Sequence, residues 1–336
     1  MLDRAKTIHC EVLSPLISNR MYNMPELRPS ELKGLIRYTY RIANYEPGTK
    51  NLFEEEVNCF GGAKENKSDA SENIETIASP VRIQMQAAGS LEIRKGFLLK
   101  HRCEKFYPYN EMNERKNPVV RYINPEQQFT ISLTIRLNSK KDIDWYEDML
   151  NLSLALGGMG MRSRRGRGCV DAHTFADMDQ TELLEWVKKV VKQINPDITE
   201  DFFNMEGTCL CLGESRQKWI QELNRPVVQK IWIGGKISAV ENWLKAVDYA
   251  SHDVKYSRYK QKKPFATGMA SPRFASSVLV SLVKLNDGIY PIYTYVKPVR
   301  GTYNKEKRMM EYNSLDEDFS ERNDFVKRIE GRGTGR

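Results

Sequence analysis

Histidine and cysteine are scarce in this sequence, and their scarcity limits the chemistry that the chain can perform. The 336 residues include four histidines and six cysteines, and no two cysteines form a Cys-x-x-Cys pair. No histidine lies in a recognised metal-ligand motif, and no serine-hydrolase or Walker phosphate-loop motif occurs. We therefore expect no resident metal, no cofactor and no catalytic residue, and the pattern favours binding over catalysis.

Long apolar runs are also missing, and acidic residues are outnumbered by basic ones. No run of eighteen apolar residues occurs, and the first residues lack the apolar segment of a secretory signal, so we expect a cytoplasmic protein without membrane contact. Lysine and arginine total 52 against 44 acids, for a net charge of +8, which favours a polyanionic partner. The length suits two domains of moderate size.

One stretch concentrates glycine and arginine. Residues 157–168 hold five glycines and four arginines without one acid. Glycine lets the main chain approach a ligand closely, and arginine offers a planar set of donors that suits phosphate oxygens. We expect Gly158, Gly160, Gly166 and Gly168 to shape this loop, and Arg162, Arg164, Arg165 and Arg167 to bind a polyanion. The alternative is a flexible, solvated basic turn.

A helix over residues 29–44 follows a half-buried strand over residues 7–13. Pro29 suits the first helical turn, and Leu32, Ile36 and Tyr40 recur at helical spacing. Lys33, Arg37 and Arg41 are spaced four apart and form a basic column beside that apolar stripe. This column either binds the polyanion or is an ordinary solvated face. The acidic run 54–56 is typical of a solvated helix surface.

The remaining pattern predicts an α+β protein. The polar residues 63–79 read as a mobile loop, and residues 101–126 as a long irregular segment rich in aromatic and basic residues. Strands are expected at 81–86, 91–99, 129–137 and 169–175, and a helix at 142–156. The order βαββαβ indicates a ferredoxin-like (RRM-like) first domain over 1–175. Residues 176–336, with helices after 179, 238 and 314 and a hairpin at 274–296, are expected to form a second such domain.

Four segments resemble the RAMP proteins of CRISPR systems. Residues 28–37 read Arg-Pro-Ser-Glu-Leu-Lys-Gly-Leu-Ile-Arg, similar to the family's Arg-Pro-Ser-x-x-Lys-Gly-x-x-Arg segment. Residues 59–62, Cys-Phe-Gly-Gly, resemble the turn that follows that helix, and residues 160–168 resemble the family's glycine-rich loop. Residues 270–275, Ala-Ser-Pro-Arg-Phe-Ala, resemble a further segment in altered order. The combination is most similar to the first RAMP subunit of the type III-B, or Cmr, effector complex.

This resemblance implies a function and partners. It implies a non-catalytic subunit of a crRNA-guided effector complex that acts against foreign RNA, with crRNA, target RNA and other RAMP subunits as partners and a position near the 3′ end of the guide. Carried over by position, the RNA-binding residues are Lys33, Arg37, Arg41, Arg162, Arg164, Arg165, Arg167 and Arg273.

Two alternatives remain open at this point. The chain could be a RAMP-fold endoribonuclease that processes CRISPR RNA, with His9 as its acid or base. Alternatively, the basic loop could bind the acidic surface of a neighbouring protein, which would make any RNA contact indirect.

Overall fold

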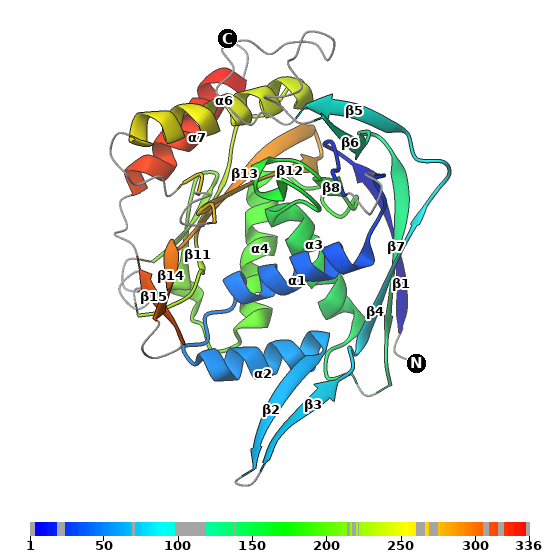
Figure 1. The fold of residues 1–336 in the computed structure, drawn as a ribbon. Helices are drawn as coiled ribbons and strands as arrows, with labels where there is room; N and C mark the ends of the chain where they lie inside the picture. Colours follow the sequence, from blue (N-terminus) through cyan, green and yellow to red (C-terminus); the bar gives the residue numbers. More distant parts are fainter. Residues whose placement is uncertain are drawn as a thin grey trace.

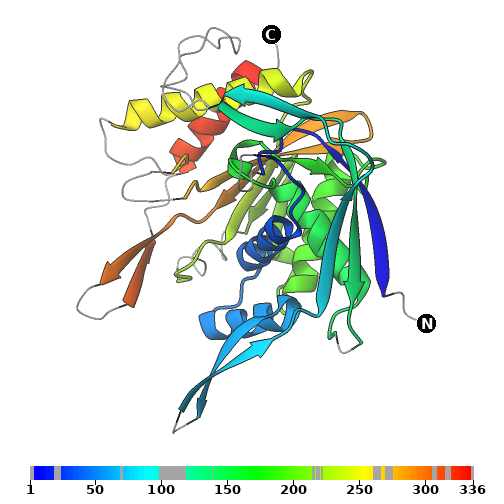
Figure 2. The same ribbon diagram turned by 45° about the vertical axis from the view of Figure 1, so that its right-hand side comes forward.

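Two antiparallel sheets and two layers of helices make up the molecule (Figures 1 and 2). The computed structural model describes residues 4–18, 24–68, 71–97, 119–137, 139–213, 216, 220, 222–259, 266–268, 275–304, 309–314 and 319–333. Helix α3 contacts strands of both sheets, so the helices around it fill the space between them. The expected mixed α+β architecture is confirmed.

The first sheet has the strand order β4-β7-β1-β8, with every neighbouring pair antiparallel. Alternating apolar residues build it: Phe129, Ile131 and Leu133 of β7 are buried, as the sequence pattern predicted. Helices α1 and α3 occupy the connections from β1 to β4 and from β7 to β8. The elements are β1 (Ala5–Val12), α1 (Pro29–Ala43), α2 (Thr49–Phe60), β4 (Val81–Ala87), β7 (Gln128–Ile135), α3 (Ile143–Leu156) and β8 (Val170–Asp171).

The second sheet has the order β12-β13-β11-β10-β9. Helix α4 starts at a capping box formed by Asp179 and Glu182, as predicted, and packs against β10. Helices α6 and α7 pack on each other and bury Trp243 and Phe325 in a second core with Tyr293. The elements are α4 (Gln180–Ile194), β9 (Phe203–Glu206), β10 (Cys209–Leu212), β11 (Val228–Ile233), α6 (Val240–Tyr259), β12 (Val278–Leu285), β13 (Gly288–Val296) and α7 (Phe319–Gly333).

Three two-stranded ribbons complete the described chain, and one of them corrects the sequence prediction. Residues 63–79, expected to be a mobile loop, form most of the hairpin β2–β3, which projects beyond α2 (Figure 1). Strands were predicted from alternating apolar residues, and this polar segment has no such alternation. Main-chain hydrogen bonds form its ladder regardless of the side chains. The ribbons are β2 (Gly62–Ser68) with β3 (Ser71–Ile77), β5 (Ile93–Phe97) with β6 (Val119–Ile123), and β14 (Val299–Asn304) with β15 (Met309–Ser314).

A second correction concerns the strand expected at 169–175, which is only two residues long. After β8, the Asp171 carboxylate accepts a hydrogen bond from the backbone N–H of His173 at 3.0 Å. His173 takes a positive φ of 57°, which turns the chain away from the sheet. A local side-chain bond therefore ends the strand early. Among the described helices, none combines the length and the apolar character needed to cross a membrane.

Candidate nucleic-acid interface

The glycine-rich loop, defined here as residues 157–168, is folded against its neighbours rather than left as a solvated turn. Met159 donates its backbone N–H to Gly168 O at 2.9 Å, which closes the loop on itself. Met161 donates to Ile17 O at 2.7 Å, and Gly166 donates to Val280 O at 2.8 Å. The loop therefore connects the chain after β1 with strand β12 of the second sheet.

Glycine is required in this loop by close main-chain packing. Gly160 and Gly168 have φ of 76° and 69°, in the left-handed region that side chains disfavour. A Cβ at Gly160 would lie 2.4 Å from Ile17 O, and one at Gly168 would lie 2.0 Å from Met159 O. Gly158 and Gly166 are equally confined, by Arg167 O and by the Trp243 ring. The four glycines thus give the loop its path.

A groove of about 450 Å³ lies between this loop and α1. We call it the α1–loop groove; Gly34 and Tyr38 line it from the helix, and Met161 and Arg164 line it from the loop. The Arg164 guanidinium lies over the Tyr38 ring at 4.6 Å and donates to Ser276 O at 3.3 Å. An aromatic ring, a guanidinium and an exposed methionine, side by side, can stack a base and hold a phosphate.

Two other arginines of the loop, Arg165 and Arg167, are held by contacts with the second half of the chain. Arg167 is 7% exposed and donates from both terminal nitrogens to Asp248 of α6, at 3.0 and 2.5 Å. Arg165 donates to Thr267 O at 2.6 Å, and burial lowers its pKa to about 10. Burial also lowers the pKa of Arg162. The loop therefore uses part of its positive charge to fix itself to α6 and to the chain around Thr267.

The basic column on α1 is divided in the same way. Arg37 and Arg41 both contact Glu56 of α2, at 2.6 and 3.4 Å, and Arg37 also donates to Gly61 O at 3.1 Å. Glu56 is buried, so the expectation that the acidic run 54–56 is a solvated surface is wrong for this residue. These contacts fix the turn after α2.

Lys33 has a different environment. It lines a hollow of about 530 Å³ together with Arg82 and Arg136, between the start of α1 and the strands β4 and β7. Within the described part of the chain, no ion pair of Lys33 is found. Burial and the neighbouring Arg37 lower its pKa. Lys33 is thus available to an anion.

Two side chains that shape these surfaces escaped the sequence analysis. A signal for Tyr38 was present in the sequence: it lies one helical turn after Gly34, so the two residues share a face of the predicted helix. Arg225, by contrast, gave no local signal. It donates to Arg41 O, Asn44 O and Glu46 O at 2.9, 2.8 and 2.7 Å, and so satisfies carbonyls at the end of α1.

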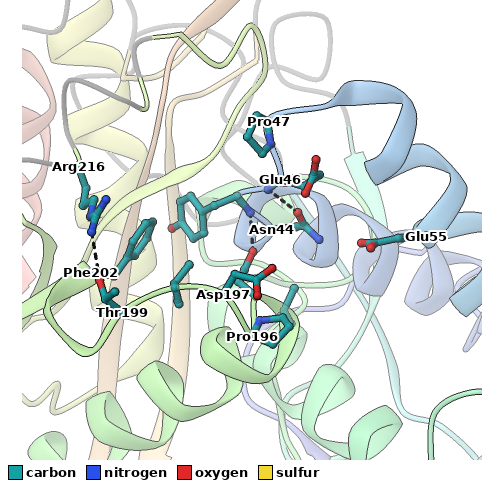
Figure 3. A pocket seen from close by; sticks show the side chains of 13 residues that line it. Asn44, Glu46, Pro47, Glu55, Pro196, Asp197, Thr199, Phe202 and Arg216 are labelled. Carbon is teal, nitrogen blue, oxygen red and sulfur yellow. Dashed lines mark hydrogen bonds between the residues drawn. The ribbon is translucent and has the colours of Figure 1, made fainter.

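A smaller pocket of about 290 Å³ lies just past the C-terminal end of α1 (Figure 3). We call it the acidic pocket, because Glu46, Glu55 and Asp197 line it with a single arginine, Arg216. Figure 3 shows Arg216 turned toward Thr199, whose hydroxyl accepts its hydrogen bond at 3.2 Å. Three carboxylates make this pocket unsuited to phosphate.

The remaining residues considered from sequence lie outside these surfaces. Arg273 and residues 101–118 fall outside the described residues. The segment 101–126 was expected to be irregular throughout, which is wrong for residues 119–123, because they form β6 and pair with β5. His9 is exposed on β1 opposite Thr130 and does not line the α1–loop groove.

The first half of the chain matches a known protein family. Residues 10–171, which run from β1 through the glycine-rich loop to β8, match the family model described as the RAMP superfamily. We therefore assign this part of the chain to the RAMP superfamily.

The whole chain is similar in fold to several solved protein chains. The crystal structure of Cmr1 from Pyrococcus furiosus in its apo form matches with a TM-score of 0.55 and 16% identity, over 96% of both chains. Chains from two cryo-EM structures of the Type III-B Cmr-beta bound to cognate target RNA match with TM-scores of 0.52 and 12% and 11% identity, over 98% of this chain and 99% and 100% of theirs. At these identities the likeness concerns the fold. No curated protein matches the chain.

Proposed function

We propose that this protein is a non-catalytic RNA-binding subunit of a cytoplasmic, crRNA-guided type III-B CRISPR effector complex. Its partners are crRNA, target RNA and other RAMP subunits, and it contacts guide or target RNA near the 3′ end of the crRNA. The RAMP match of residues 10–171 and the likeness of the whole fold to Cmr1 and Cmr-beta chains support this assignment.

The α1–loop groove is the observation that carries the proposal. It joins the two sequence segments that suggested RNA binding, although more than 120 residues separate Gly34 of the helix from the loop. Tyr38 supplies a ring for a base, and Arg164 supplies a guanidinium for the adjacent phosphate. Contacts of this kind recognise backbone and stacking, so affinity should depend weakly on sequence and strongly on salt.

The contacts of the arginines divide the expected RNA-binding set into two roles. Lys33, Arg162 and Arg164 contact RNA in this proposal. Arg165 and Arg167 position the loop through Thr267 and Asp248. Arg37 and Arg41 hold Glu56, and Arg41, with half of its side chain exposed, also faces solvent and RNA.

The finer fold assignment is also a proposal. The first sheet, with its order β4-β7-β1-β8 and helices in both crossovers, has the connectivity of a ferredoxin-like domain. In the second sheet β11, β12 and β13 follow the same plan around α6, and β10, which precedes β11, takes the place of the fourth strand. We therefore infer a ferredoxin-like first domain over 1–175 and a modified one over 176–336.

The experiment is a binding titration of the full chain with single-stranded RNA across a salt series, followed by a denaturing gel. We expect the logarithm of the association constant to fall linearly with the logarithm of salt concentration, with a slope of about 0.7 per phosphate contact. The RNA should stay intact with and without Mg²⁺. Cleavage lost in His9→Gln would replace the proposal with the endoribonuclease alternative, and salt-independent binding would also contradict it.

A further inference from the structure

A cluster of three potential metal ligands lies outside the α1–loop groove. Glu11 of β1 stands directly opposite Asp171 of β8 in the sheet, and His173 follows two residues later. One ligand atom from each residue can be chosen so that all three lie within 4.8 Å of one another. The three residues converge because β1 pairs with the short strand that leaves the glycine-rich loop.

The Asp171 carboxylate supplies an independent indication of a ligand. Its side chain is 1% exposed, and Oδ1 accepts the backbone N–H of His173. Oδ2 lies 3.0 Å from Nδ1 of His173, yet no donor of the described residues is aligned to hydrogen-bond it. A buried carboxylate oxygen without a donor is unfavourable, and in native proteins such an oxygen is commonly paired with a cation or a metal.

The spacing of these atoms indicates which kind of ion fits. Two ligands at about 2.1 Å from one metal lie roughly 3.0 Å apart when they occupy neighbouring positions of an octahedron. Nδ1 of His173 and Oδ2 of Asp171 have this separation. Two carboxylates and one imidazole suit Mn²⁺, because carboxylate oxygens prefer Mg²⁺ and Mn²⁺ and imidazole prefers transition metals.

The charges around the cluster limit its affinity for a cation. Lys284 of β12 lies 3.2 Å from Oε2 of Glu11, so it already neutralises one of the two carboxylate charges. The second carboxylate, on Asp171, remains for the ion. Lys284 joins β12 to Glu11, whereas the ion itself would connect β1 with β8 and the turn that follows β8.

We propose that Glu11, Asp171 and His173 form a binding site for a single divalent cation of the Mn²⁺ class. The ion secures the chain where it leaves the glycine-rich loop. This inference is independent of the proposed RNA binding, because none of its ligands lines the α1–loop groove. Three protein ligands leave the other octahedral positions to water.

The test is a titration of the RNA-free full chain with Mn²⁺, followed by electron paramagnetic resonance of the free ion. We expect one ion per chain in the wild type. His173→Gln should weaken binding at least tenfold, because it removes a ligand from an exposed position and leaves the fold intact. Glu11→Gln should weaken it similarly.

His9→Gln is the matched control, since His9 is an exposed histidine on β1 two residues before Glu11. It should bind Mn²⁺ as the wild type does. Mn²⁺ should also raise the melting temperature of the wild type and of His9→Gln, and leave that of His173→Gln unchanged. Absence of stoichiometric binding by the wild type, or equal binding by His173→Gln, would overturn the proposal.

Discussion

Two of the hollows beside helix α1 differ in charge. The α1–loop groove runs along the helix from Glu31 to Thr39 and is lined by Gly34, Tyr38 and Arg164; its one acid, Glu31, lies 3.3 Å from Arg28. The acidic pocket past its last turn contains three carboxylates and Arg216 (Figure 3). The net charge of the chain therefore does not decide where a polyanion binds; the local placement of acids does.

The two hollows also differ in what forms them. The groove depends on a loop whose path requires glycine and whose position is held by Arg167 on Asp248 of α6. The pocket depends on the contact between the ends of α1 and α4, where Asn195 accepts from Tyr45 N and donates to Ala43 O. Changes at each set of contacts should therefore separate the two surfaces.

The largest expected effect follows from removing the anchor of the loop. Asp248→Ala leaves the Arg167 guanidinium buried without its partner, which should lower the free energy of unfolding by about 3 to 5 kcal/mol. Urea denaturation followed by circular dichroism measures this loss. The double variant Arg167→Met/Asp248→Leu should recover much of it, because no charge is then left buried. A loss below about 1 kcal/mol in the single variant would mean that the ion pair does not hold the loop.

The next effect concerns the path of the loop. Gly168→Ala combines a positive φ of 69° with a Cβ 2.0 Å from Met159 O, so we expect destabilisation of at least about 2 kcal/mol and weaker RNA binding. Gly207→Ala is the matched control, since Gly207 has a φ of 58° and nothing within 4 Å of its Cβ position. Differential scanning calorimetry should give a distinctly smaller loss for the control. Equal losses of stability in Gly168→Ala and Gly207→Ala would mean that the positive φ alone, and not the close contact with Met159 O, causes the effect.

Removal of one guanidinium should distinguish the groove from the pocket directly. Arg164→Ala should weaken RNA binding about tenfold, the effect of one charge-assisted contact, and should reduce the salt slope by about 0.7. Arg216→Ala removes the same charge from the acidic pocket and should change neither quantity. Fluorescence anisotropy at several salt concentrations measures both. Equal slopes for the two variants would remove the distinction between the surfaces.

Gly34→Ala should separate stability from binding. Nothing lies within 4 Å of a Cβ at this position, so alanine should stabilise α1 by about 1 kcal/mol. The added methyl group extends into the α1–loop groove and should weaken RNA binding several-fold. Thermal denaturation should show a higher melting temperature, and fluorescence anisotropy on the same sample should show weaker RNA binding. If RNA affinity stays unchanged, no ligand approaches the helix backbone there.

The smallest effect is a pH dependence of binding through Lys33. Burial and Arg37 lower its pKa, so Lys33 loses its charge at a lower pH than a solvated lysine does. RNA affinity should therefore decline as the pH is raised into the alkaline range. Lys33→Arg should remove this decline, because arginine stays charged. The titration needs a 2′-O-methyl oligonucleotide of adenine and cytosine, which neither hydrolyses nor ionises there. An unchanged profile in Lys33→Arg would exclude Lys33 as the cause.

The sequence predicted the regular elements well, because α1, α3, β7 and the β12–β13 hairpin each carry a local periodic pattern. It also identified the loop and the helix that form the groove. It did not predict which cations face solvent, since the partners of Arg167 and Arg37, Asp248 and Glu56, are 81 and 19 residues away. The cluster around Asp171 was invisible for the same reason, because Glu11 reaches it only through strand pairing.

The most direct test of the central claim is photo-crosslinking of the full chain to single-stranded RNA containing 4-thiouridine, with the attached peptides identified by mass spectrometry. We predict adducts at Tyr38 and Met161, the two groove residues best suited to contact a base. Crosslinks confined to other surfaces, with none on α1 or on residues 157–168, would contradict the account.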